Sequence, residues 1–246
     1  MKNILILGDS HLNAFKRGHD SLAIKDKHLF EKRRIDFSGN ASHRLKFFSL
    51  NESEEKIYLR KNKKVSQTSK WDRARQSSEP LSLQQYDTFL ITASSCRLDP
   101  NFLYGKTPKQ FPLYSMDLLK QVIYSPRPGS CKDPKIVRSI LEHYPQKTIL
   151  IGQPLPDEKS KKAAFITTLN DRCRENISTN VKTIRSICAQ EQPSSNPTIY
   201  LPPEHLLGPL GITTKTEYMM PPDDNNHANE AYGTKILLDL ITRKLI

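Results

Sequence analysis

Residues 4–11, with the sequence ILILGDSH, decide the fold, because four consecutive aliphatic residues run straight into a Gly-Asp-Ser turn. An apolar run of this kind is typical of a central parallel strand, which is covered on both faces and shows no polar alternation. Gly8 allows the chain to turn sharply, and the apolar residues at 12, 14 and 15 predict a helix directly afterwards. We therefore expect Ser10 at the carboxyl edge of a sheet, where open α/β folds bind their ligands.

Ser10 has two interpretations at this point. Asp9 and Ser10 are both residue types that favour helix N-caps, so the pair could do no more than begin the following helix. Alternatively, Ser10 is a nucleophile, since the unpaired N–H groups of a helix N-terminus stabilise an alkoxide or an oxyanion. The second interpretation requires a general base from elsewhere in the chain.

The composition predicts one compact core with polar excursions. The chain has 246 residues, of which 36% are hydrophobic, and its mean hydropathy is −0.60. Such a length holds one sizeable α/β domain, and we expect a single domain over residues 1–246. Charged and serine residues dominate at about 49–83, where we expect a polar insertion outside the core, with a small hairpin formed by 56–59 and Val65.

No stretch approaches the roughly 18 apolar residues that a membrane-spanning helix needs. The four-residue apolar run before Gly8 is too short for a signal peptide. We therefore expect a cytoplasmic protein without a membrane span.

The formal net charge of +12 and a pI near 9.5 predict attraction to polyanions. Tyr58 and Trp71 lie among the basic residues, a mixture found on nucleic-acid surfaces. No recognisable nucleic-acid motif accompanies them, so a solvated basic face or a groove for an acidic substrate is favoured over a nucleic-acid role. The basic clusters are 32–34, 60–64, 70–75 and 159–162.

The cysteines are widely spaced and form no Cys-x-x-Cys pair, so free thiols are expected. They are Cys96, Cys131, Cys173 and Cys188. Cys96 stands at a strand end but has no paired base in sequence, which favours a buried thiol. Neither metal-ligand spacing nor a Gly-x-Gly-x-x-Gly motif is present, so no metal and no dinucleotide cofactor are expected.

Several later strands end, like the first, in small polar residues, and strands alternate with helices. Strands are predicted at 34–37, 86–93, 148–152 and 198–201. Helices are predicted at 113–124, at 136–143, from Asp157 to about 189, and at 234–245. The alternation predicts a three-layer α/β domain. Ser10, Gly39 and Ser94 would then lie along one edge of its parallel sheet.

The far end of the chain offers a general base. Asp224 and His227 stand at i and i+3, so the carboxylate can hold one ring nitrogen while the other accepts a proton from a serine. Asp223 is a weaker candidate for that carboxylate. Asp-x-x-His alone is more typical of a surface or capping pair, so the combination with Ser10 carries the prediction.

Together these motifs resemble the SGNH, or GDSL, hydrolase family. Gly-Asp-Ser at 8–10, Gly39, Asp-x-x-His at 224–227, Asn229 and Tyr232-Gly233 follow the family's order over almost the whole chain. The resemblance implies the SGNH-hydrolase fold, a flavodoxin-like parallel sheet of order 2-1-3-4-5 flanked by helices.

The resemblance also implies roles for individual residues. Ser10 matches the nucleophile, His227 the general base and Asp224 the residue that orients it. The backbone N–H groups of Ser10 and Gly39 match two oxyanion donors. His11 directly follows the nucleophile and could contact substrate, or could equally face solvent.

The chain departs from the family at the end of its third strand. The family places Gly-x-Asn there, and the asparagine amide completes the oxyanion hole, whereas residues 92–96 read TASSC. Ser94, Ser95 or the amide of Asn40 are candidates for the missing donor, and Ser95 is also a candidate substrate contact. Loss of such a donor costs on the order of a hundredfold in rate.

The chain most resembles subgroups linked to bacterial capsule and cell-surface polysaccharide genes, through its Gly-Asp-Ser-His opening and Asp-x-x-His-x-Asn ending. That resemblance implies a serine esterase that removes acyl groups, in particular acetyl, from carbohydrate through an acyl-serine. Two alternatives remain: an O-acyltransferase of polysaccharide biosynthesis, and a weakly active or inactive module that binds acidic glycan or nucleic acid. No cofactor is implied.

Overall fold

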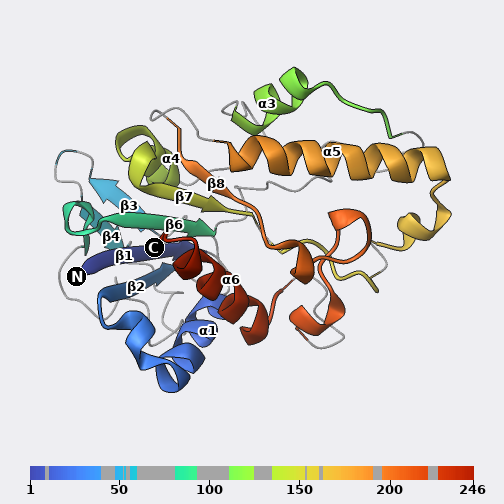
Figure 1. The fold of residues 1–246 in the computed structure, drawn as a ribbon. Coiled ribbons are helices and arrows are strands. Elements are labelled where there is room, and N and C mark those ends of the chain that lie inside the picture. Colours follow the sequence, from blue (N-terminus) through green and yellow to red (C-terminus); the bar gives the residue numbers. More distant parts are fainter. Residues whose placement is uncertain are drawn as a thin grey trace.

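A five-stranded parallel sheet forms the centre of the molecule (Figure 1). The computed structural model describes residues 1–8, 11–39, 48–51, 53, 56–59, 81–92, 111–124, 135–152, 154–160, 163–190, 196–220 and 227–246. The strands of the sheet are β1 (Lys2–Gly8), β2 (Arg33–Gly39), β6 (Thr88–Thr92), β7 (Thr148–Ile151) and β8 (Thr198–Tyr200). Their order is β2-β1-β6-β7-β8, and every neighbouring pair is parallel. Counted among themselves, these strands follow the predicted order 2-1-3-4-5, and the α/β fold is confirmed.

Helices cover both faces of this sheet. They are α1 (Leu12–Lys25), α3 (Met116–Tyr124), α4 (Lys135–His143), α5 (Asp171–Ala189) and α6 (Glu230–Thr242). Short 3-10 turns complete the connections: Lys27–Phe30, Leu83–Gln85, Pro145–Lys147, Ala164–Thr168, Glu204–Leu206, Pro209–Gly211 and Thr216–Tyr218. Within the described ranges, no helix has the length and apolar content needed to cross a membrane.

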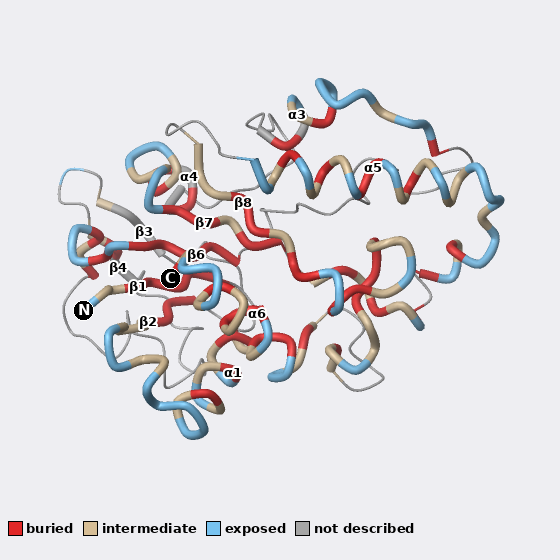
Figure 2. Tube along the Cα trace, viewed as in Figure 1, coloured by how far each residue is buried: buried red, intermediate tan, exposed pale blue. Residues whose placement is uncertain are grey.

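The strand β1 is buried on both faces, as its unbroken apolar run predicts (Figure 2). Ile4 and Ile6 point into a core built with α1 and α6. Leu5 and Leu7 point to the opposite face, into a second core with residues of β6 and α4. The alternation follows from the two-residue period of a strand and makes β1 the middle layer of the domain.

A second sheet corrects the prediction for the polar insertion. The strands β3 (Phe48–Asn51), β4 (Lys56–Leu59) and β5 (Leu81–Ser82) pair antiparallel. The partner of 56–59 in the hairpin is 48–51, and Val65 lies outside the described residues. Ile57 and Leu81 are only 1% and 3% exposed and belong to the same core as Leu5. These two apolar residues therefore bring part of the insertion into the core.

Two helix starts differ from the prediction by four residues or more. Asp157 does not begin a helix. Its Oδ1 accepts from Lys159 N within a turn and from Thr216 Oγ1, which lies far along the chain. The helix α5 begins at Asp171 instead, where Asn170 Oδ1 accepts from Cys173 N (2.8 Å). The last helix, α6, begins at Glu230, four residues earlier than predicted, and Asn229 is its N-cap.

Candidate functional site

Two glycines allow the first and last helices to touch backbone to backbone. A Cβ on Gly233 would lie 2.9 Å from Phe15 N and closer still to the Ala14 carbonyl oxygen. A Cβ on Gly18 would lie 2.7 Å from the Gly233 carbonyl carbon and closer still to Thr234 N. No side chain fits into either space, so only glycine permits this approach. The contact joins α1, which follows Ser10 in the sequence, to α6, which follows His227 (Figure 1).

The residues that precede these helices meet at the carboxyl edge of the sheet. The rings of His11 and His227 lie with their centroids 5.1 Å apart at an interplanar angle of 39°. His11 is 7% exposed, so the solvent-facing alternative is wrong for this side chain. Ser10 precedes His11 in the sequence, but it and Asp224 lie outside the described residues.

The strand ends beside this pair carry little side-chain bulk. Gly39, Gly8 and Thr92 are register partners across β2, β1 and β6. A Cβ on Gly39 would come within 2.6 Å of Leu12 Cδ2 and closer to the Gly8 carbonyl oxygen. A Cβ on Gly8 would clash with the Thr92 hydroxyl. Gly39 thus lies beside Gly8, the last residue of β1, while the other candidate donors, Asn40, Ser94 and Ser95, fall outside the described residues.

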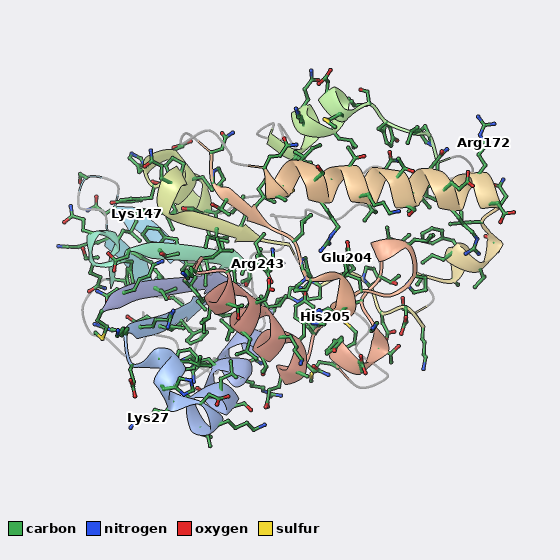
Figure 3. The ribbon with its side chains drawn as sticks, in the orientation of Figure 1. Lys27, Lys147, Arg172, Glu204, His205 and Arg243 are labelled. Atoms are coloured by element: carbon green, nitrogen blue, oxygen red, sulfur yellow. The ribbon has the colours of Figure 1, made fainter. Side chains whose placement is uncertain are left out.

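Helix α6 is also fixed to the sheet through β8. The Tyr200 hydroxyl donates to Asp239 Oδ2 (2.6 Å), and Arg243 Nε lies 2.9 Å from the same oxygen. Burial, followed by the hydrogen bond to Asp239 and the charge of that carboxylate, raises the pKa of Tyr200, so its hydroxyl remains a donor. Figure 3 labels Arg243 on this helix. The helix that follows His227 is therefore held at two places.

The segment before His227 rests on the loop after β7. Thr216 Oγ1 donates to Asp157 Oδ1 (2.6 Å), and Thr216 N donates to Glu158 Oε1 (3.2 Å). Asp157 is only 5% exposed. Met219, three residues after Thr216, forms an antiparallel bridge with Ala228, the residue that follows His227. The bridge thus connects the loop after β7 to His227 through residues 216–219.

We expect Thr216→Val to lower the free energy of unfolding by about 1–3 kcal/mol, because it leaves the buried carboxylate of Asp157 with one hydrogen bond fewer. Urea unfolding followed by circular dichroism measures the change. Thr216→Ser keeps the hydroxyl and should stay within about 1 kcal/mol of wild type. Equal losses in the two variants would contradict the role of this bond.

Several basic side chains of the described residues are engaged in internal contacts. In the 32–34 cluster, Arg33 donates to the carbonyls of Leu29 (2.7 Å) and Ile246 (3.2 Å). Arg34 pairs with Asp36 at 3.1 Å. On α5, Arg185 pairs with Glu204 at 3.2 Å, and Figure 3 labels Glu204 beside that helix. The clusters at 60–64 and 70–75 lie outside the described residues.

The described ranges contain two of the four cysteines and no cluster of possible metal ligands. Cys173 and Cys188 are free thiols, as predicted for them. Burial raises the pKa of Cys188 to about 12, so this thiol is protonated and a poor nucleophile at neutral pH. Cys96 and Cys131 fall outside the description. No group of three His, Cys, Asp or Glu side chains gathers there in a way that could hold a metal ion.

Comparison with known proteins leaves the function to be argued from this geometry. No family model matches the chain, and neither the curated proteins nor the solved structures gave a significant match. A fold of this kind hosts many unrelated activities, so the site has to carry the argument.

Proposed function

We propose that this protein is a serine hydrolase of the SGNH type that cleaves acyl esters through an acyl-serine on Ser10. The observation that supports it is the 5.1 Å approach of the His11 and His227 rings. The two motifs, Gly-Asp-Ser-His and Asp-x-x-His, lie at opposite ends of the chain. The contact between α1 and α6 brings His11 of the first motif and His227 of the second to one edge of the sheet. If either histidine had only a structural role, the His11 and His227 rings would have no need to lie side by side.

In the proposed reaction, Ser10 Oγ attacks the ester carbonyl carbon while His227 accepts the serine proton. Asp224 orients the imidazole, and the N–H groups of Ser10 and Gly39 stabilise the oxyanion. Collapse of the tetrahedral intermediate breaks the C–O bond, and His227 gives its proton to the leaving alcohol. Water, deprotonated by His227, then releases the acid and restores the serine.

The proposed substrate is an acyl ester, in particular an acetyl ester, on carbohydrate. This class follows from the resemblance to polysaccharide-linked subgroups. The net charge of +12 favours an acidic glycan among such substrates. An O-acyltransferase would use the same acyl-serine and differ only in its acceptor, a sugar hydroxyl in place of water.

A fluorophosphonate probe tests the proposal directly. We expect it to label Ser10 in the full chain, with the adduct located by peptide mass spectrometry, and we expect no label in Ser10→Ala. His28→Ala is the control: this exposed histidine follows the far end of α1, a helix of 14 residues and about 21 Å. Its labelling should match wild type.

The contradicting outcome is a folded wild-type protein that is not labelled and turns over none of a panel of short acyl esters. The sequence at 92–96, which lacks the family asparagine, would then favour a binding module. Salt-dependent binding of an acidic polysaccharide, unchanged in Ser10→Ala, would support that second function.

A further inference from the structure

The side chain of Asn229 uses both ends of its amide. Its Oδ1 accepts from Tyr232 N (3.2 Å) and caps α6. Its Nδ2 donates to the carbonyls of Glu217 (2.8 Å) and Met219 (3.1 Å). The Asn229 side chain therefore joins the start of α6 to the segment 217–219.

The backbone around His227 repeats this connection. Met220 N donates to the His227 carbonyl (2.8 Å), and Asn229 N donates to the Tyr218 carbonyl (3.0 Å). Residues 218–220 and 227–229 thus pair as a short antiparallel ladder centred on the Met219–Ala228 bridge. His227 stands at one end of this ladder, and Asn229 stands at the other end, where α6 begins.

We propose that Asn229 is a positioning residue for His227. Its amide holds the two residues between His227 and α6 in a fixed conformation. The docking of α6 on α1 therefore sets the position of the imidazole beside His11. The inference rests on the proposed function. A misplacement of about 1 Å in a catalytic group can cost about a hundredfold in rate.

The chemistry of the site explains why an asparagine is used. Serine and aspartate are equally suited to cap a helix, but an ionised aspartate has no donor and a serine hydroxyl has one. An asparagine amide offers one acceptor for the helix and two donors for two carbonyls. Substitutions that keep the cap but lose the paired donors therefore separate positioning from helix stability.

The experiment compares Asn229→Ser in the full chain with wild type and with Asn170→Ser. Asn170 caps α5 in the same manner, so it is a matched control for the exchange of the cap. We expect Asn229→Ser to lower kcat for a short acyl ester by about 10- to 100-fold, with KM changed by less than about twofold. Its urea midpoint should fall modestly, because two hydrogen bonds to partly exposed carbonyls are lost, but the chain should remain folded. Asn170→Ser should alter neither kcat nor KM.

A second measurement does not depend on turnover. The nuclear Overhauser effect between ring protons of His11 and His227 should be present in wild type and Asn170→Ser and should weaken in Asn229→Ser. If Asn229→Ser does not fold, Asn229→Gly replaces it, because glycine is tolerated at an N-cap and places neither a donor nor a charge against the two carbonyls.

An unchanged Overhauser effect in the Asn229 variant overturns the positioning role whatever its activity, and so does an unchanged kcat in an active enzyme. If wild type neither reacts with the fluorophosphonate nor cleaves esters, while the Overhauser effect is lost in the variant, the positioning role stands and the hydrolase function fails.

Discussion

His227→Ala is expected to lower kcat/KM for short acyl esters by about a thousandfold or more, the typical result of removing the base from a Ser-His-Asp arrangement. Without the imidazole, Ser10 would attack as a neutral hydroxyl, and no group would return a proton to the leaving alcohol. Initial rates with a p-nitrophenyl ester, measured in wild type and variant at the same pH, give the ratio. His227 is only partly buried, so the variant should fold.

His205→Ala is the matched control for this variant. His205 is exposed in the turn Glu204–Leu206 and is labelled in Figure 3. Its activity should remain within about twofold of wild type, since surface substitutions away from a site have small effects. Similar activity in His227→Ala and wild type would remove His227 from the mechanism, even if Ser10 were labelled.

Gly233→Val is expected to lower the free energy of unfolding by about 3 kcal/mol or more, the upper range for overpacking a buried site. The new Cβ would collide with the backbone of Ala14 and Phe15, which cannot move aside as the end of a flexible side chain could. The helices would have to separate, which would also part His11 from His227. Urea unfolding measures the loss of stability.

Ala231→Val provides the comparison on the same helix. Ala231 is exposed two residues earlier in α6, so the change adds a β-branched side chain without a clash. The expected loss is about 0.7 kcal/mol or less, from helix propensity alone. Equal unfolding midpoints in the two variants would show that α1 and α6 do not touch at Gly233.

The central sheet could be predicted because its signals are local. Each strand is a short apolar run that ends in small or polar residues, and one chain of such runs separated by helices has few arrangements. The start of α5 could not be read in this way. Asp157 has the residue type of an N-cap, but its carboxylate bonds to Thr216, far along the chain. A long-range partner of this kind leaves no local signal.

Part of the placement of the candidate site could be predicted. Gly39 lies at the expected sheet edge, and His227 lies beside His11, the residue that follows Ser10 in the sequence. The catalytic roles of all the candidate residues remain predictions, and Ser10, Asp224, Asn40, Ser94 and Ser95 lie outside the described residues. The role of Asn229 was not foreseen, because its donors reach carbonyl groups that only the fold places within range. Its sequence signal was limited to an asparagine just before a helix, which predicts a cap and nothing more.

The contact between the first and last helices has a consequence for biosynthesis. During translation, β1 and α1 leave the ribosome before α6, which follows much later in the sequence. Pairing of segments so distant in sequence is a slow step, because a long loop must close first. His11 and His227 cannot meet before that step is complete. The nascent chain should therefore lack an assembled site, and one covered face of the central sheet, until α6 docks.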